Sequence, residues 1–247
     1  MKLYKRIVLL LGFGTLLLPV GGQVKPADLK TACEVFNLYN KQVRDALLSK
    51  EKAKSLFAEK MQTIIHAYTS LHQMDSMANP QFHFPLQGYT ASAIGGKNGN
   101  GYYGSSYSYF DGNKHKGHPA HDIFINDRNQ DALDDKTLKP VAVVSVDYGV
   151  VIAMEQHWDT TSSLRGGKYI YIFNPHTKRI WYYAHCATIK VSLGDVVYAG
   201  QPIATVGRTG MNAFKKRSPT HLHLMLLELN KAGLPQPINC YSLLKNL

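Results

Sequence analysis

The feature that most constrains the fold is a series of short β-rich segments with no helical stretch between them. These segments are 122–125, 140–146, 149–155, 168–173, 179–185, 203–206 and 221–229. Neighbouring segments this close together pair as antiparallel strands, because a parallel pair needs a crossover of a dozen or more residues. The sequence therefore predicts a mainly β domain, with an antiparallel sheet of barrel-sandwich type, and an α+β fold overall.

The N-terminal part of the chain has the periodicity of helices. Apolar residues recur every three or four positions from Leu29 to Val43, and a second stripe runs from Ala53 to Leu71. This pattern predicts either a helical hairpin or one long bent helix. Its apolar face is expected to pack on itself or on the β domain, and a regulatory segment that shields a groove is the alternative interpretation.

The first 22 residues are typical of a secretory signal peptide. Lys2, Lys5 and Arg6 precede an apolar core, Ile7–Val20, which is shorter than the roughly 20 apolar residues of a membrane span. We expect cleavage before Gln23, export to the periplasm or cell envelope or beyond it, and no stable membrane span afterwards. An uncleaved anchor is the alternative. The expected division is then a signal peptide at 1–22, a helical segment at 23–75 and a β domain at 76–247.

The charge of the chain is strongly positive, with a formal net charge of +11, and its hydrophobic content of 45% is enough to form a core. A basic exported protein suits an anionic polymer such as cell wall, or an acidic membrane surface. A basic surface without a dedicated partner explains the charge equally well. The sequence has no basic stretch interleaved with aromatic residues, so we expect no nucleic-acid partner.

The cysteines, Cys33, Cys186 and Cys240, are odd in number. In an exported chain at least one of them must be free or must pair between molecules. A bridge between Cys33 and Cys240 is conceivable, because they lie near the two ends of the mature chain. Cys186 is expected to be a small buried hydrophobic residue.

One acidic segment begins like a calcium-binding loop. Asp127, Asn129 and Asp131 match the alternating first ligands of an EF-hand loop. However, the sixth position is Ala132 instead of Gly, and the twelfth is Leu138 where a bidentate Glu is required. A solvated acidic loop is therefore the preferred interpretation.

Two histidine motifs, His118-Pro119-Ala120-His121-Asp122 and His221-Leu222-His223, lie about a hundred residues apart. Side chains two positions apart on a strand lie on the same face, so His221 and His223 can reach one site. Four extended residues would span roughly 13 Å. Because Pro119 also disfavours a helix, the chain must bend for His118 and Asp122 to share an ion. These ligand types suit zinc, whose catalytic sites keep three protein ligands and one open position.

With these motifs the chain resembles the zinc endopeptidases of the lysostaphin/LytM type, which cut bacterial cell-wall peptides. Those enzymes have His-x-x-x-Asp early, His-x-His late and another histidine on a strand between them. Here the intermediate histidine is His185, in Trp181-Tyr-Tyr-Ala-His185, and residues 191–210 also resemble the run before the family's His-x-His. The resemblance covers about residues 84–230.

The resemblance implies a role for each matched residue. One zinc ion per chain would be held by His118, Asp122 and His223, and the catalytic residues would be His185 and His221. Zinc in such a site lowers the pKa of bound water to about 7 and polarises a carbonyl group. The implied cofactor is Zn²⁺ and the implied partner is peptidoglycan.

Two neighbouring residues of the first motif, Ala120 and His121, allow other interpretations. His121 is an alternative ligand, but adjacent residues of a strand point in opposite directions. Ala120 stands where the family commonly has Gly, so a positive φ there would strain the backbone. No glutamate adjoins a histidine in this sequence, which excludes the His-Glu-x-x-His base of thermolysin-like enzymes.

The predicted function is that of an exported zinc-dependent endopeptidase that hydrolyses peptide bonds of peptidoglycan, in a cross-bridge or a stem peptide. The alternatives are a non-catalytic wall-binding regulator of an amidase and a metallopeptidase that acts on exported proteins. The sequence does not separate a D-Ala–diaminopimelate link from a polyglycine bridge as the cleaved bond, and it leaves the oligomeric state open.

Overall fold

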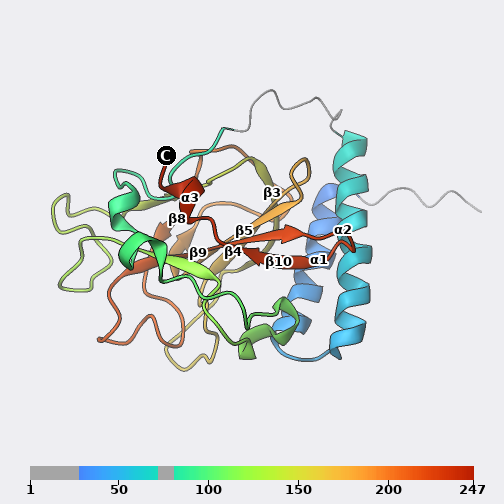
Figure 1. Cartoon of the computed structure of the whole chain (residues 1–247), viewed down its shortest axis with the longest axis horizontal. Helices are drawn as coiled ribbons and strands as arrows, with labels where there is room; N and C mark the ends of the chain where they lie inside the picture. Colours follow the sequence, from blue (N-terminus) through green and yellow to red (C-terminus); the bar gives the residue numbers. More distant parts are fainter. Residues whose placement is uncertain (1–27, 72–80) are drawn as a thin grey trace, which may run out of the picture.

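The computed structural model describes residues 28–71 and 81–247 (Figure 1). The predicted signal peptide at 1–22 lies outside the described residues. Within the two described ranges, no helix combines the length and the apolar character that a membrane-spanning segment needs.

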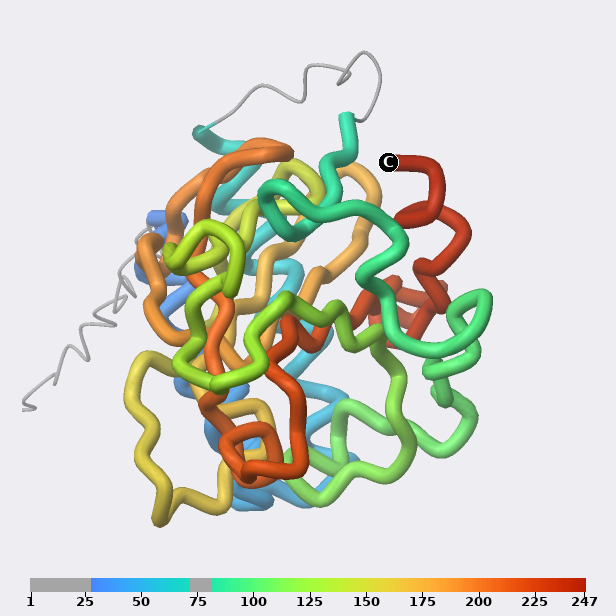
Figure 2. The backbone as a smooth tube through the Cα atoms, turned by 90° about the vertical axis from the view of Figure 1, so that its left-hand side faces the viewer, coloured from blue at the N-terminus to red at the C-terminus, as the bar shows by residue number. Residues whose placement is uncertain are grey.

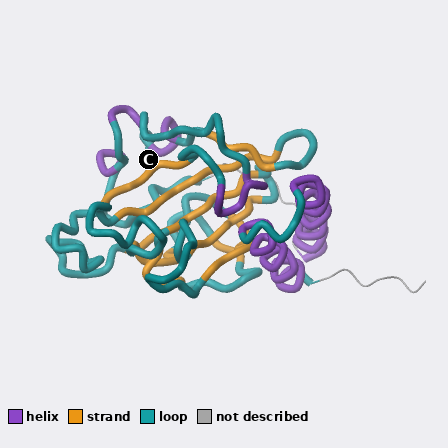
Figure 3. Tube along the Cα trace, turned by 90° about the horizontal axis from the view of Figure 1, so that it is seen from below, coloured by secondary structure: helices purple, strands orange, loops and turns teal. Residues whose placement is uncertain are grey.

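The N-terminal helices form a hairpin of α1 (Leu29–Arg44) and α2 (Lys50–Leu71). Asp28 caps α1, because its side chain accepts a 2.9 Å hydrogen bond from the backbone N–H of Thr31. Soon after α1 ends, Ala46 adopts φ +56, a left-handed conformation that does not continue a helix. Of the two alternatives that the periodicity left open, the hairpin is the one formed. Figure 3 shows the two helices lying against one side of the strands.

The larger sheet has seven strands, in the order β1-β9-β5-β4-β3-β7, with β10 also paired to β9. The strands are β1 (Ala120–Phe124), β3 (Gly149–Glu155), β4 (Tyr169–Asn174), β5 (Arg179–Ala184), β7 (Val196–Val197), β9 (His221–Leu229) and β10 (Pro235–Ile238). All of their pairings are antiparallel, which confirms the predicted α+β class with a mainly antiparallel sheet.

A second sheet of three strands has the order β2-β8-β6. It consists of β2 (Ala142–Val144), β6 (Cys186–Ile189) and β8 (Pro202–Val206), again paired antiparallel. The remaining elements are the short 3₁₀ helices η1 (Ala91–Ala93), η2 (Lys97–Gly99) and η3 (Tyr109–Lys114), and the C-terminal helix α3 (Tyr241–Leu244).

Two buried clusters hold these layers together. The first lies between the two sheets and contains Ile123, Trp181 and Val206. The second lies between the helical hairpin and the other face of the large sheet, and it contains Phe57 and Ile152. Every residue of β3 is buried, as expected for a strand covered on both faces. The order of layers is therefore helices, large sheet, small sheet.

All three cysteines are free and buried. Cys33 belongs to the cluster under the helices, whereas Cys240 belongs to the cluster between the two sheets. The conceivable bridge between these two residues is therefore wrong, because the large sheet separates their environments.

The acidic loop after β1 is organised by its own backbone. The carboxylate of Asp127 accepts hydrogen bonds from the backbone N–H groups of Asp131 and Ala132, at 3.1 and 2.9 Å, and from the hydroxyl of Thr220 at 2.6 Å. Its oxygens are thus engaged by N–H and O–H donors. This arrangement favours the interpretation as a structural loop over a calcium site.

Candidate metal centre

The pairing of β1 with β9 brings the two histidine motifs together. In this antiparallel register Asp122 lies opposite His223, and Phe124 lies opposite His221. On the other side of β9, His223 lies opposite Ala184 of β5. His185 is the next residue after Ala184, so it also lies near His223. The ring centroids of His185 and His221 are 4.8 Å apart. The strand register therefore gathers residues that are far apart in sequence at one place on the sheet.

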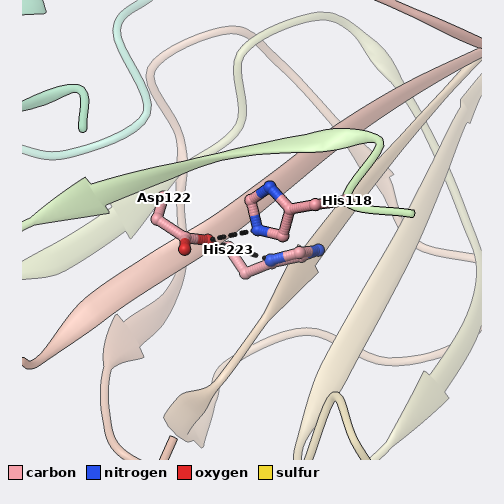
Figure 4. Close-up of side chains that lie close together, drawn as sticks. All are labelled: His118, Asp122 and His223. Atoms are coloured by element: carbon pink, nitrogen blue, oxygen red, sulfur yellow. Dashed lines mark hydrogen bonds and ion pairs between the residues drawn. The ribbon is translucent and has the colours of Figure 1, made fainter. Parts of the chain in front are cut away.

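His118, Asp122 and His223 form a group that could hold a metal ion, with ligand atoms all within 4.8 Å of one another. Figure 4 shows the Asp122 carboxylate on one side of the two imidazole rings, with a dashed line to each of them. Its Oδ1 lies 3.2 Å from Nε2 of His118 and 3.0 Å from Nδ1 of His223. An ion bound tetrahedrally at about 2.1 Å from each ligand requires ligand atoms about 3.4 Å apart. The donor set therefore suits zinc, and the two distances from Asp122 lie close to this spacing.

The orientation of His118 is set by a backbone carbonyl. Its Nδ1 lies 2.9 Å from the carbonyl oxygen of Gly101, which can only accept, so Nδ1 carries a proton and Nε2 is the ring nitrogen that faces Asp122. His118 lies before β1, where it pairs with Tyr103 in an isolated bridge, and its Nε2 lies 3.2 Å from Oδ1 of Asp122. Ala120 is not among the residues with positive φ, so the departure from Gly causes no strain there.

His185 and His221 are oriented in the same way as His118. Nδ1 of His185 donates to the carbonyl oxygen of Thr209 at 2.8 Å, and Nδ1 of His221 donates to that of Pro219 at 2.7 Å. In each ring Nε2 is therefore the atom left for chemistry. Nε2 of His221 lies 3.7 Å from Oδ1 of Asp122.

His185 has an unusual backbone conformation, with φ +66. The predicted strand 179–185 is one residue too long, because β5 ends at Ala184 and His185 forms the junction with β6. The backbone N–H of His185 donates to the carbonyl oxygen of Gly166 at 3.0 Å. A strained residue held by its surroundings is common at functional sites.

The electrostatics of the metal-free site keep Asp122 ionised. Burial raises the pKa of Asp122, but hydrogen bonds from His118 and His223 outweigh this effect and hold the pKa well below its usual range. Burial, followed by the nearby His221 and His223, lowers the pKa of His185 well below its usual value. His185 is therefore neutral at pH 7 and can accept a proton at Nε2.

An open cleft surrounds these residues. Its walls come from the loop before β1, the loop between β3 and β4, and the loop before β9, and the last two lie side by side in Figure 2 (yellow and orange-red). Its lining residues are His115, Gly117, His118, Asp122, Arg165, Gly166, Tyr182, His185, Asn212, Ala213, Ser218, His221 and His223. Neither helix of the hairpin contributes to this lining.

Three more residues near the site, His115, His121 and Arg165, are placed by the structure. His121 is buried and points away from Asp122, with Nε2 2.9 Å from Oδ1 of Asn239. His115 and Arg165 line the cleft although sequence reasoning gave them no role. No short motif marks Arg165, because its loop reaches the site only through folding.

Comparison with known proteins assigns this region to a family. The sequence model of peptidase family M23 matches residues 129–235, a range that includes His185, His221 and His223. A search of curated proteins gave no match.

Solved structures of peptidases are also similar to this chain. Lysostaphin from Staphylococcus simulans is 23% identical, with a TM-score of 0.36, over 53% of this chain and 44% of that one. A zinc-containing peptidase from Vibrio cholerae is 20% identical, with a TM-score of 0.41, over 66% of this chain and 40% of the other. A glycyl-glycine endopeptidase LytM from Ruminococcus gnavus, described as putative, is 21% identical, with a TM-score of 0.43, over 86% of both chains. The chain thus spans less than half of the length of the first two.

The family match covers the late histidine motif and the intermediate histidine, and the fold places His118 and Asp122 beside them. Residues 129–235 are therefore similar to peptidase family M23, and this match covers less than half of the chain.

Proposed function

We propose that this protein is an exported zinc-dependent endopeptidase that hydrolyses peptide bonds of bacterial peptidoglycan. The observation that carries the proposal is the group of His118, Asp122 and His223, whose ligand atoms lie within 4.8 Å of one another in an open cleft. His185 and His221 stand beside this group, each with Nδ1 bound to a carbonyl oxygen. A ligand set with two further imidazoles is what a metal-assisted hydrolase needs.

In this proposal the zinc ligands are Nε2 of His118, Oδ1 of Asp122 and Nδ1 of His223. When bound there, zinc supplies Lewis-acid polarisation of the substrate carbonyl and acidifies the attacking water. His185, neutral because it is buried, accepts the proton of that water at Nε2. His221 would stabilise the substrate carbonyl oxygen from its Nε2 side as negative charge develops on that oxygen.

The substrate assignment is supported by charge and by family. Removal of Lys2, Lys5 and Arg6 with the proposed signal peptide takes the formal net charge from +11 to +8, which still suits an anionic polymer such as cell wall. One structural relative is described as an antimicrobial peptidase and another as a glycyl-glycine endopeptidase. The cleaved bond in this proposal lies in a cross-bridge or in a stem peptide. We propose export through the signal peptide at 1–22, with the helical segment at 23–75 and the peptidase domain at 76–247 in the mature chain.

Digestion of purified peptidoglycan by residues 23–247, with fragments read by mass spectrometry, tests this proposal. We expect new peptide ends that are absent with the His223→Ala variant and retained with His66→Ala, a control at an exposed histidine of α2. Release of no fragment by the zinc-loaded protein, combined with stimulation of an amidase, would instead support the wall-binding regulator. Cleavage of casein but not of peptidoglycan would support a peptidase for exported proteins.

A further inference from the structure

Arg165 is a cation in the wall of the cleft. It lies in the loop between β3 and β4, and it lines the same cleft as the proposed ligands His118, Asp122 and His223. Its neighbour His115 is neutral at pH 7, because burial and then the Arg165 charge lower the pKa of His115 to about 4. The guanidinium group is therefore the fixed positive charge on this wall of the cleft.

The backbone around Arg165 is tied to three separate segments. The N–H of Arg165 donates to Oδ1 of Asn113 at 2.9 Å. The carbonyl oxygen of Leu164 accepts from the N–H of Met211 at 2.8 Å, and that of Gly166 accepts from the N–H of His185 at 3.0 Å. The position of Arg165 is thus coupled to His185, at the junction of β5 and β6, and to the neighbouring loop before β9. A backbone held at these points positions the Arg165 side chain at the cleft, which lowers the entropy cost of binding a ligand.

The guanidinium group has spare hydrogen-bonding capacity. Its Nη1 donates to the carbonyl oxygen of His115 at 2.6 Å. In the described part of the chain no carboxylate forms an ion pair with Arg165. The acidic residue in the cleft lining, Asp122, is engaged by the histidines around it. Since a guanidinium has five N–H donors and keeps its charge at all ordinary pH values, most of its donors are available to a ligand.

We propose that Arg165 binds a substrate carboxylate next to the scissile amide, and so selects a D-Ala–diaminopimelate type of link over a polyglycine bridge. This inference rests on the proposed function. In such a link the carbon attached to the scissile nitrogen carries a free carboxylate, whereas the glycines of a bridge carry no such group. A planar guanidinium matches a carboxylate with two parallel hydrogen bonds, which makes arginine suited to this recognition.

Two synthetic peptides test the inference. Each joins D-alanine to diaminopimelate, and they differ only in whether the carboxyl group next to the scissile nitrogen is free or is a carboxamide. For the wild-type protein we expect kcat/KM to be roughly 10- to 100-fold higher with the free carboxylate, the range typical of hydrogen bonds to a charged group. The Arg165→Met variant should lose this preference, because its kcat/KM on the free carboxylate falls to about its value on the carboxamide. Circular dichroism shows whether the variant is folded.

The matched control is Lys116→Met, which removes an exposed cation from the same rim and should keep the preference. Arg165→Lys should retain part of it, because a lysine supplies charge without the bidentate geometry. A wild-type protein without preference, or an Arg165→Met variant that keeps it, contradicts the inference. If neither peptide is cleaved, the proposed function fails for this bond. The inference is then tested by calorimetric binding of the two peptides: wild type must bind the free carboxylate more tightly than the carboxamide, and Arg165→Met must bind the two equally.

Discussion

The helical hairpin is predicted to be part of the folded core rather than a detachable cover, and Phe57→Ala tests this directly. Phe57 of α2 is fully buried, with its ring centroid 5.7 Å from that of Phe36 in α1. The same ring lies 5.2 Å from Tyr109, the first residue of η3. Tyr109 in turn donates a hydrogen bond to Asn40 at 2.8 Å. Phe57 thus joins both helices to the segment that leads to His118.

The magnitude follows from the loss of a fully buried ring. A Phe→Ala change in a core costs about 3–5 kcal/mol, from lost transfer free energy plus the cavity left behind. For a chain of this size each kcal/mol lowers the Tm by about 2–4 °C. The expected decrease in the Tm of Phe57→Ala is therefore roughly 6–20 °C.

Thermal unfolding of residues 23–247, followed by circular dichroism, measures this decrease. The matched control is Leu38→Ala in α1, whose side chain is 64% exposed and whose loss should change stability by less than about 0.5 kcal/mol. A Phe57→Ala protein with the Tm of the control would refute the reasoning. It would mean that the hairpin packs too weakly to be part of the core, and a removable, regulatory segment would become the better interpretation.

Two further predictions concern the edge of the hairpin and the cleft. Burial raises the pKa of Glu155, but its hydrogen bonds with Arg44 at 2.8 Å, with the His157 N–H and with Lys41 outweigh this and lower the pKa overall. Its contribution to stability is therefore present above the unfolded-state pKa of about 4.3 and is lost as the pH falls through the lower folded-state value. The Tm difference between wild type and Glu155→Gln should accordingly narrow below about pH 4, and a difference that widens there would contradict the pairing. Gly210 has φ +115, and a Cβ there would lie 2.4 Å from the carbonyl oxygen of Arg165 and 2.9 Å from Nδ1 of His185. Gly210→Ala should therefore displace His185 and lower kcat/KM by about 100-fold while the zinc content stays unchanged, and loss of zinc would show that the effect lies elsewhere.

The longer strands could be predicted from the sequence, because their apolar runs have flanking turns. The predicted segments 149–155 and 221–229 coincide with β3 and β9. The short strands β6, β7 and β10 were not predicted. β6 begins two residues after β5 ends, β7 has two residues, and β10 contains prolines, which occur in sheets at edges. Their pairing depends on neighbours that no local pattern reveals.

The side chains of the candidate site could be predicted from two motifs and the resemblance, but the groups that orient these side chains could not. The spacing of His221 and His223 on one strand places both on one face, and the resemblance supplied His118, Asp122 and His185. The carbonyl groups that orient the rings belong to Gly101, Thr209 and Pro219. A backbone carbonyl has no sequence signature, and the loop carrying Arg165 reaches the cleft through hydrogen bonds to distant segments. These features follow from tertiary structure alone.

The most direct test of the account is the zinc content of purified residues 23–247, measured by mass spectrometry of the metal, for the wild type and for His223→Ala and His66→Ala. We predict one zinc per chain in the wild type and in His66→Ala, and strong loss in His223→Ala that remains folded by circular dichroism. Equal zinc in His223→Ala and wild type, or no zinc in the folded wild-type protein at neutral pH, would contradict the assignment of His118, Asp122 and His223 as the metal centre.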